Sequence, residues 1–514
     1  MTSIPLRDGT RLQADVHVQD APAPAILVRT PYSRTLFEVE VAPLVAAGYA
    51  VVVQSVRGRH GSDGSFVPFA SEGPDGYDTV EWVAEQPWCD GRVAMVGASY
   101  GAWVQWAAAR EEPPHLSALV SSVCCASWTG EWPWRNGVLF PGAITWLHLV
   151  AGQDDVELTA DEQARLADPF TPLRGLQDRY RRPLPQADDW LRHPTADAYW
   201  APLQLTPDDF AAIDLPVLHV TGWFDGCQLG SQFLYDGMRQ HSPARDRQSL
   251  LIGPWDHTVR QPRRSYDGCD FGPEAVLDYH AERIAWLDAH VRGHGTPAAS
   301  RVFVTGADRW RTDAVFPPAG TRPRTWHLHP GRSLADGPPA APEPASWNHD
   351  PNDPVPARPD GTAGAHPHLQ RQDVHTRADV LVHTGEPLEE ELTVLGTGTI
   401  ELLASTSAAD TDWIVELCDV APDGVALLVA HGVVRAGTPG TLVPGRPQTY
   451  RISLSPRAHT FRPGHRMTVA VMSSAAPLYA PNPGHGGDLW NDPTTVIARN
   501  TLHAGALTLP LEEA

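Results

Sequence analysis

Long uninterrupted runs of apolar residues alternate with amphipathic, helix-like segments over most of the first 300 residues. Runs of this kind, rich in Val and Ile, are typical of strands that are buried on both faces of a sheet. Their alternation with helices predicts a parallel sheet that carries helices on both faces. The pattern predicts strands at 25–32, 49–58, 92–99, 215–223 and 248–255, and helices at 39–48, 75–86 and 274–293, the last one ended by Gly293.

The stretch from 128 to 207 interrupts this alternation. It is rich in Trp, as in SWTGEWPWRNG, and it predicts helices without strands. A helical insertion between the strands of a sheet is a natural place for a segment that walls a ligand pocket. We therefore interpret 128–207 as a cap, and a separate helical domain is the alternative.

Residues from about 317 to 368 are dense in Pro and Gly, as in DGPPAAPEPAS, which predicts an extended, linker-like segment. Beyond it, short strand-like runs such as ELTVLGTGTIELLAST and TYRISLSP follow one another at regular spacing. This pattern is typical of an antiparallel sandwich or jelly roll. The predicted units are an α/β core at 1–127 and 208–316, a helical cap at 128–207, and a Pro-rich linker with an all-β jelly-roll domain at 317–514.

Composition limits the classes of molecule that we expect this protein to bind. The chain carries 61 acidic and 39 basic side chains, a formal net charge of −22, which disfavours binding to nucleic acid or to anionic membranes. We find no N-terminal targeting segment and no run of 18 apolar residues. The six cysteines are scattered without a CxxC pair, so they predict free thiols in a cytoplasmic protein, with neither a disulfide framework nor a metal site.

One short motif contains a candidate catalytic nucleophile. The turn GASYG at 97–101 follows a predicted strand and opens a predicted helix, which is the context of a nucleophile elbow. Such a turn holds Ser99 in a strained backbone conformation and places its hydroxyl at the positive end of the helix. The alternative is a tight corner with an inert serine.

A serine nucleophile needs a general base, and the base needs an acid that orients it. Asp225, in VLHVTGWFDGC, comes just after one predicted strand, and His257, in LLIGPWDHT, comes just after the next. The chain order Ser, Asp, His is that of α/β-hydrolases. Asp256 is adjacent to His257 and cannot reach around it, so Asp225 is the candidate acid.

Further segments extend this pattern in order along the chain: IPLRDGTRLQADVHV, RTPYSR, EWVAEQPWCDGRVAMVGASYGA, TGWFDG, GPWDH, SAADTDWIVELCDVAPDG and FRPGHRMTVAV. Together they resemble the CocE/NonD acyl hydrolases, which are related to the X-Pro dipeptidyl-peptidases of the α/β-hydrolase superfamily. The resemblance covers nearly the whole chain. It implies an α/β-hydrolase core with an inserted helical cap and a C-terminal galactose-binding-like jelly roll.

The resemblance also implies a role for each matching residue. Ser99 would be the nucleophile, His257 the general base and then acid, and Asp225 the residue that orients His257. Tyr32, in RTPYSR, would stabilise the oxyanion with its hydroxyl, together with the backbone N–H of Tyr100. The alternative is a Tyr32 that only packs at the end of a strand.

The chain departs from the family pattern at several positions. The family often has G-x-S-Y-x-G, whereas here Gly101 comes early and Ala102 takes the place of the later glycine. Ser55 stands where the family usually has Asp, which puts a local pairing with Arg57 in doubt. Candidate pocket residues are Cys227 and Trp223, which flank the predicted acid, and Trp132 and Trp146 in the cap.

These observations predict a serine hydrolase that cleaves carboxylic esters, or amides, of small acyl or aromatic acids through an acyl-enzyme, without a cofactor. The alternatives within the family are an X-Pro dipeptidyl-peptidase and an α-amino-acid ester hydrolase. The former usually has an additional N-terminal helical domain, and Gly226-Cys227-Gln228 lacks the acids that hold the substrate ammonium in the latter. The alternative outside enzymes is a decayed hydrolase that binds a carbohydrate or a partner. We expect a small-molecule substrate and no nucleic-acid or membrane partner, and homo-oligomerisation stays open.

Overall fold

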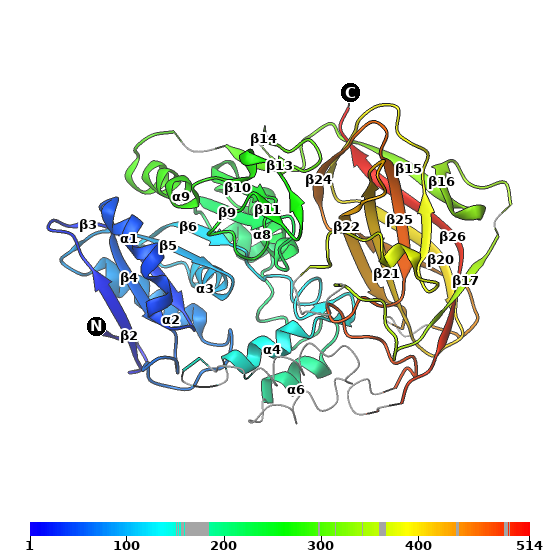
Figure 1. Cartoon of the computed structure of the whole chain (residues 1–514). Helices are drawn as coiled ribbons and strands as arrows, with labels where there is room; N and C mark the ends of the chain where they lie inside the picture. The colour runs from blue at the N-terminus through cyan, green and yellow to red at the C-terminus, as the bar shows by residue number, and fades with distance from the viewer. Residues whose placement is uncertain are drawn as a thin grey trace.

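Two β-sheets divide the molecule into an N-terminal and a C-terminal part (Figure 1). The protein is described by a computed structural model that covers residues 1–150, 152, 154, 155, 159, 185–296, 299–313, 315–341, 343–358, 366–437, 442–487, 492 and 494–513. Within these residues the first large sheet has ten strands and the second has twelve. The fold confirms the predicted α/β core followed by a β-rich domain, and the exact domain boundaries stay predictions.

The first sheet is parallel at its centre and antiparallel at its two edges. The parallel pairing runs from β4 through β3, β5, β6, β9 and β10 to β13. Every position of β3, β9 and β10 is buried, as their apolar runs predict. In order across the sheet, the strands are β1 (Thr2–Pro5), β2 (Arg11–His17), β4 (Ala50–Ser55), β3 (Ala23–Thr30), β5 (Cys89–Ala98), β6 (Leu116–Ser122), β9 (Val217–Gly222), β10 (Gln248–Gly253), β13 (Ser300–Val304) and β14 (Arg309–Asp313).

Helices cover both faces of this sheet, and each face has its own hydrophobic cluster. Val80 of α2 and Trp103 of α3 belong to one cluster, whereas Leu44 of α1 and Trp286 of α9 belong to the other. None of the described helices is both long and apolar enough to cross a bilayer. The bounds are α1 (Glu38–Ala46), α2 (Glu72–Ala84), α3 (Tyr100–Ala109), α7 (Pro207–Ala212), α8 (Gln228–His241) and α9 (Tyr279–Leu287).

The helix predicted at 274–293 is shorter than its apolar pattern suggests. A separate 3-10 turn, η3 (Pro273–Ala275), comes first, and α9 begins only after Asp278, whose side chain accepts a hydrogen bond from the Ala281 N–H. α9 continues into a π-helical turn, η4 (Asp288–Arg292). The helical run ends at Gly293, which has a φ of 72°, so the predicted glycine stop is confirmed.

The described part of the predicted cap contains helices and one short hairpin. α4 (Gly142–Leu149) and α6 (Pro185–Arg192) lie side by side at the bottom of the view in Figure 1. β7 (Trp134–Arg135) pairs with β8 (Val138–Leu139), so the prediction of a segment without strands is wrong here, because the Asn136-Gly137 turn lets the chain fold back. The rest of the predicted helices between 156 and 184 lie outside the described residues, apart from residue 159.

The second sheet is mostly antiparallel and includes part of the segment predicted as a linker. Three strands within 317–368 pair into this sheet, because frequent Pro and Gly at the turns do not prevent pairing of the short runs between them. Those strands are β15 (Arg322–His329), β16 (Ser333–Asp336) and β17 (Ala345–His349). The others are β18 (Leu381–Thr384), β19 (Leu392–Gly396), β20 (Thr399–Thr406), β21 (Asp412–Val420), β22 (Ala426–Arg435), β23 (Gln448–Ser453), β24 (Arg457–Phe461), β25 (Arg466–Met472) and β26 (Ala498–Leu511).

Smaller elements connect these units. They are the hairpin β11 (Ser265–Tyr266) and β12 (Cys269–Asp270), and the 3-10 helices η1 (Arg34–Phe37), η2 (Arg245–Arg247), η5 (Pro330–Arg332) and η6 (Val374–Thr376).

A buried ion pair joins two helices on the same face of the first sheet. Glu40 on α1 accepts hydrogen bonds from Arg283 on α9, at 2.7 Å to Oε2, and from Arg260. Burial raises the pKa of Glu40, but the charges of Arg283 and Arg260 outweigh burial, and its pKa lies below the usual range. Both Glu40 and Arg283 are almost completely buried, so neither charge has bulk water as an alternative partner.

We predict that Glu40→Gln lowers the free energy of unfolding by about 3 kcal/mol, because it leaves the Arg283 charge buried without its counter-charge. Chemical denaturation of the wild type and the variant measures the difference. Glu38→Gln, at an exposed position of the same helix, is the matched control and is expected to have little effect. Equal stability of the two variants would contradict the prediction.

Candidate active site

Ser99 occupies the sharp turn between β5 and α3. Its backbone angles, φ 58° and ψ −122°, belong to a region that non-glycine residues rarely adopt. The Ser99 N–H donates to the Ser122 carbonyl on β6 at 2.9 Å, and its own carbonyl accepts from the Trp103 N–H at 3.1 Å. The strained turn is therefore held by the neighbouring strand and by the helix that it opens, which is the arrangement of a nucleophile elbow.

Gly97 is the position that makes this turn feasible. A Cβ atom at Gly97 would lie 2.4 Å from the carbonyl oxygen of Gly101, a distance that real Cβ atoms do not reach. A Cβ atom at Gly101 would lie 3.4 Å from the Arg29 carbonyl oxygen, which is close to ordinary van der Waals contact. The early glycine at 101 therefore fits the turn, and the strict requirement for glycine lies at 97.

Asp225 and His257 follow two adjacent parallel strands, β9 and β10, and their side chains meet. His257 Nδ1 lies 2.7 Å from Asp225 Oδ1. The Asp225 carboxylate also accepts from the Thr221 hydroxyl at 2.8 Å and from the Cys227 N–H at 3.0 Å. Because three donors surround it, the buried carboxylate is fixed in place, and the bond to Nδ1 directs Nε2 of the imidazole away from it.

The environment of His257 changes its basicity. The His257 side chain is 40% exposed, and its partial removal from water lowers its pKa. The charge of Asp225 and its hydrogen bond outweigh this effect, so the pKa lies above its usual value of about 6.5. A raised pKa is favourable for a group that must accept a proton from a serine hydroxyl.

Ser99 and His257 line one cavity of about 190 Å³. Its surface is predominantly apolar, so a bound group would be held mainly by contact with rings. The described residues that line the cavity are Phe69, Ser99, Tyr100, Trp103, Cys125, Trp132, Phe140, Trp146, Gly226, Cys227 and His257.

The two tyrosines expected at the oxyanion differ in what they can offer. The Tyr32 hydroxyl accepts a hydrogen bond from Trp146 Nε1 at 2.8 Å and keeps its own proton, and burial raises the pKa of this phenol. The Tyr100 hydroxyl is occupied, since it donates to Glu72 at 2.6 Å and accepts from the Phe69 N–H. The backbone N–H of Tyr100 is the first of α3 and has no acceptor within the helix.

Aromatic rings form much of the cavity wall. Phe69 stacks on Trp146, with ring centroids 5.6 Å apart, and Trp132 meets Trp146 edge-on at 5.5 Å. The structure thus brings the predicted pocket residues Trp132 and Trp146 to the same cavity as Ser99. These rings pack against one another, so each ring restricts the movement of its neighbours.

Trp223 lies elsewhere. Its side chain is fully buried, its Nε1 donates to the Phe303 carbonyl at 2.6 Å, and its ring packs against Phe316. It is absent from the described residues that line the cavity. Nearby residues of a turn can point in different directions, so the proximity of Trp223 to Asp225 in the sequence does not bring its ring into the cavity.

The prediction of free thiols is wrong for two cysteines. Cys125, shortly after β6, and Cys227, two residues after Asp225, form a disulfide across 102 residues of sequence. Both line the cavity. The bond therefore ties the segment that leads from β6 into the cap to the loop that carries Asp225. Its partners could not be paired from sequence spacing because only the fold brings them together. The free cysteines among the described residues are Cys89, Cys124, Cys269 and Cys418.

The structure shows which residues Ser55 and Arg57 contact, since the sequence put a pairing between them in doubt. Arg57 forms an ion pair with Asp75, at 2.6 Å, instead of with a residue at position 55. The Ser55 hydroxyl accepts a hydrogen bond from Arg34, two residues after Tyr32. The departure at 55 thus leaves Arg57 paired, and Ser55 is an additional acceptor for Arg34, which also pairs with Asp15 at 2.8 Å.

Several cavity residues had no clear local signal in the sequence. Phe69 lies in the loop after β4 with a φ of 70°, and Phe140 lies in the cap, so only the fold places them beside Ser99. Trp103 could have been found, because it lies four residues after Ser99 on a predicted helix, and residues at that spacing share a helix face.

Two sets of described side chains place three potential metal ligands within 4.8 Å of one another. One set coincides with the candidate site, where Cys227 already belongs to the disulfide. In the other set the Glu416 carboxylate pairs with Arg371 at 2.9 Å. The sets are Asp225, Cys227 and His257, and His375, Glu416 and Cys418.

Known proteins share this architecture over the full chain. Residues 8–259 match the X-Pro dipeptidyl-peptidase (S15 family), and residues 293–508 match the X-Pro dipeptidyl-peptidase C-terminal non-catalytic domain. A cocaine esterase from Rhodococcus sp. is 31% identical, with 97% of this chain and 93% of the relative covered. An aminopeptidase structure from a marine sediment Thaumarchaeota archaeon has a TM-score of 0.89 at 25% identity, covering 100% of this chain and 96% of the other. An α-amino acid ester hydrolase structure has the same TM-score at 23% identity, covering 99% and 96%.

These likenesses define the protein as a serine hydrolase built on an α/β-hydrolase core. More narrowly, the chain belongs to the S15 family, the group of X-Pro dipeptidyl-peptidases, cocaine esterase and CocE/NonD hydrolases.

We predict that kcat/KM for an ester substrate rises with pH through an inflection above 6.5, because only neutral His257 accepts a proton and its pKa is raised. Initial rates at subsaturating substrate between pH 5 and about 9 measure the inflection, and circular dichroism over the same range controls for unfolding. An inflection below 6 would show that burial, and not Asp225, dominates the pKa of His257.

Proposed function

We propose that the protein hydrolyses carboxylic esters through an acyl-enzyme on Ser99. The observation that supports this most directly is that a strained serine elbow and His257, which is itself bound to the buried Asp225 carboxylate, line one apolar cavity. A serine that only filled a corner would need neither the strained backbone nor a histidine held by a buried carboxylate.

The proposed first half-reaction forms the bond between Ser99 Oγ and the acyl carbon. His257 Nε2 takes the hydroxyl proton, while Asp225 holds Nδ1–H and stabilises the imidazolium. The negative charge that develops on the carbonyl oxygen is stabilised by the Tyr32 hydroxyl and the Tyr100 N–H. When the tetrahedral intermediate collapses, the bond to the leaving oxygen breaks and His257 donates its proton to the alcohol product.

The second half-reaction repeats the same steps with water. His257 removes a proton from a water molecule, the water oxygen attacks the acyl carbon, and the bond to Ser99 Oγ breaks. The proton on His257 returns to Ser99, and the carboxylic acid leaves. Both halves need the same base and the same oxyanion donors, so one rigid site serves both.

The proposed acyl group is neutral and aromatic. The cavity wall consists of aromatic rings and the Cys125–Cys227 disulfide, which offer contact area but no negative charge. The buried Glu131 carboxylate is occupied by the N–H groups of Leu229 and Gly230 at the start of α8 and does not line this cavity. The relative named cocaine esterase supports an ester as the substrate class.

An α-amino acyl substrate is the second candidate. It is supported by the two solved relatives, an aminopeptidase and an α-amino acid ester hydrolase. A buried ammonium group needs an opposite charge beside it, since its desolvation is otherwise costly. The described lining residues contain no carboxylate, so the geometry favours the neutral acyl group.

We predict that Ser99→Ala abolishes ester turnover and labelling by a fluorophosphonate probe while the melting temperature stays close to that of the wild type. The substitution deletes a single oxygen at the cavity surface, so it removes the nucleophile without opening the core. Labelled wild-type protein, digested and analysed by mass spectrometry, should carry the probe on Ser99. Turnover by the variant at a comparable rate would refute the proposed nucleophile.

We also predict that neutral esters are hydrolysed better than their α-amino counterparts. Phenylacetyl and phenylglycyl esters with the same leaving group form a matched pair, because they differ only in the ammonium group. A tenfold preference in kcat/KM for the amino ester corresponds to about 1.4 kcal/mol of ammonium recognition, and that result would establish the second candidate instead.

A further inference from the structure

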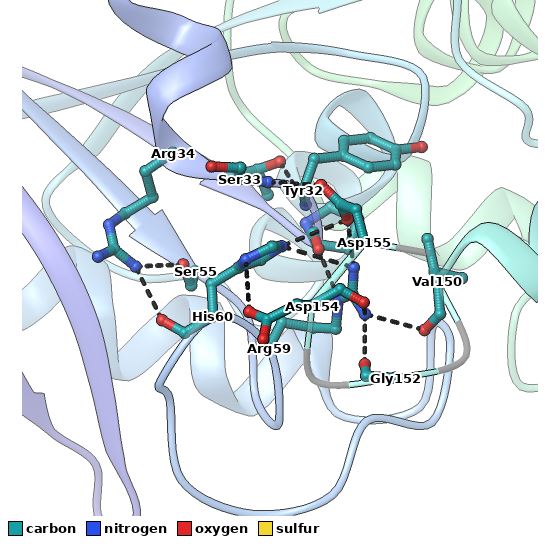
Figure 2. Close-up of polar contacts among 12 residues, drawn as sticks. Tyr32, Ser33, Arg34, Ser55, Arg59, His60, Val150, Gly152, Asp154 and Asp155 are labelled. Carbon is teal, nitrogen blue, oxygen red and sulfur yellow. Dashed lines mark hydrogen bonds and ion pairs between the residues drawn. The ribbon is translucent and has the colours of Figure 1, made fainter. Parts of the chain in front are cut away.

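Tyr32 lies on a short segment whose backbone is bound on both sides by one ion pair. Arg59, in the loop after β4, is completely buried, and its Nε donates to the Pro31 carbonyl at 2.6 Å. The Asp155 carboxylate accepts from the Ser33 N–H at 3.1 Å through Oδ2 and pairs with Arg59 Nη2 through Oδ1. Figure 2 shows Arg59 and Asp155 side by side, with Tyr32 on the segment above them.

The Arg59 guanidinium also binds the segment at the end of α4. This helix carries Trp146, whose indole N–H binds the Tyr32 hydroxyl. Arg59 Nη1 donates to the carbonyl of Val150 at 3.1 Å, and to those of Gly152 and Asp154. Val150 is the C-terminal cap of α4, the helix that carries Trp146. A cation at this end is also favoured by the helix dipole.

The Arg59 guanidinium therefore helps to place both the backbone and the hydroxyl of Tyr32. Its backbone is held through Pro31 and Ser33, and its hydroxyl is held by Trp146 Nε1 at 2.8 Å, on the helix whose end Arg59 binds. Arg59 links the loop after β4 to the segment that follows α4, and this link alone would be a structural role. Its contacts surround the one side chain that the proposed mechanism uses as an oxyanion donor.

We propose that the Arg59–Asp155 ion pair positions the Tyr32 hydroxyl for oxyanion stabilisation, so that Arg59 and Asp155 are positioning residues of the reaction. The inference rests on the proposed function, because it assigns the pair a role through Tyr32. A donor stabilises the transition state only when it points at the site where charge develops, so a small displacement of Tyr32 lowers kcat. A link that only attached the cap would act on stability or on KM.

A double-mutant cycle tests this role. Asp155→Ala removes the acceptor of the Ser33 N–H and the counter-charge of Arg59, and the variant is made in the wild type and in a Tyr32→Phe background. We expect Asp155→Ala to lower kcat about tenfold with KM within about twofold of the wild type. In the Tyr32→Phe background, the further loss in kcat should be less than about twofold, because the phenol through which Asp155 acts is absent.

Asp154→Ala is the matched control. The neighbouring carboxylate is 84% exposed and lies 3.3 Å from His60 Nδ1, and the backbone carbonyl that Arg59 binds is retained in the variant. We expect this control to keep the wild-type kcat. Asp155→Asn, which retains an oxygen acceptor for the Ser33 N–H, should lose less activity than Asp155→Ala, and it replaces the alanine variant in the cycle if the latter does not fold.

Three results would overturn the positioning role. They are an Asp155→Ala variant with full kcat, an equal loss of kcat in both backgrounds, and a Tyr32→Phe variant that itself keeps full kcat. These outcomes differ from a failure of the proposed function. That failure would show as a wild type without ester turnover or without a label on Ser99, whereas here the wild type is active and only the coupling is missing.

Discussion

The close approach of the Gly97 and Gly101 backbones is the constraint on which the site depends. Only without a side chain at 97 can β5 turn directly into α3, and only that turn holds Ser99 at the carboxyl end of the sheet with its helix behind it. β5, β9 and β10 run parallel in the same sheet, so their carboxyl ends lie at the same edge. Asp225 and His257 lie on the same side of the sheet as Ser99 because each of them follows a strand that ends at this edge.

The second domain supports this edge as well. Arg457, at the start of β24, lies over the rings of Trp223 and Phe224, at 5.5 and 4.9 Å from their centroids, and Gln228 donates to the Pro456 carbonyl at 2.7 Å. These contacts flank the turn that carries Asp225. The β-rich domain is therefore part of the framework around Asp225, although it contributes no residue to the described cavity lining.

Sequence patterns predicted those parts of the molecule that depend on local burial. β3, β9 and β10 are buried throughout, so their apolar runs were unambiguous, and Asp225 and His257 could be found because each follows such a run. Three other features depend on contacts between distant segments. Phe69 enters the cavity from a loop, Cys125 and Cys227 bond across 102 residues, and strands within 317–368 are hidden among turn residues. The periodicity of apolar residues carries no information about contacts between segments that are distant in the sequence.

The hydrogen bond from Trp146 to Tyr32 has a consequence for how this enzyme can diversify. Trp146 lines the cavity, and its N–H donates to the hydroxyl of Tyr32, the proposed oxyanion donor. A change at 146 that admits a different acid therefore also disturbs the rate. Phe69 stacks on Trp146, so an exchange at 69 also affects the residue that binds the phenol. Phe140 has no polar side-chain atom, so natural variation and directed evolution toward new acyl groups should accumulate at Phe140, while the tryptophan remains.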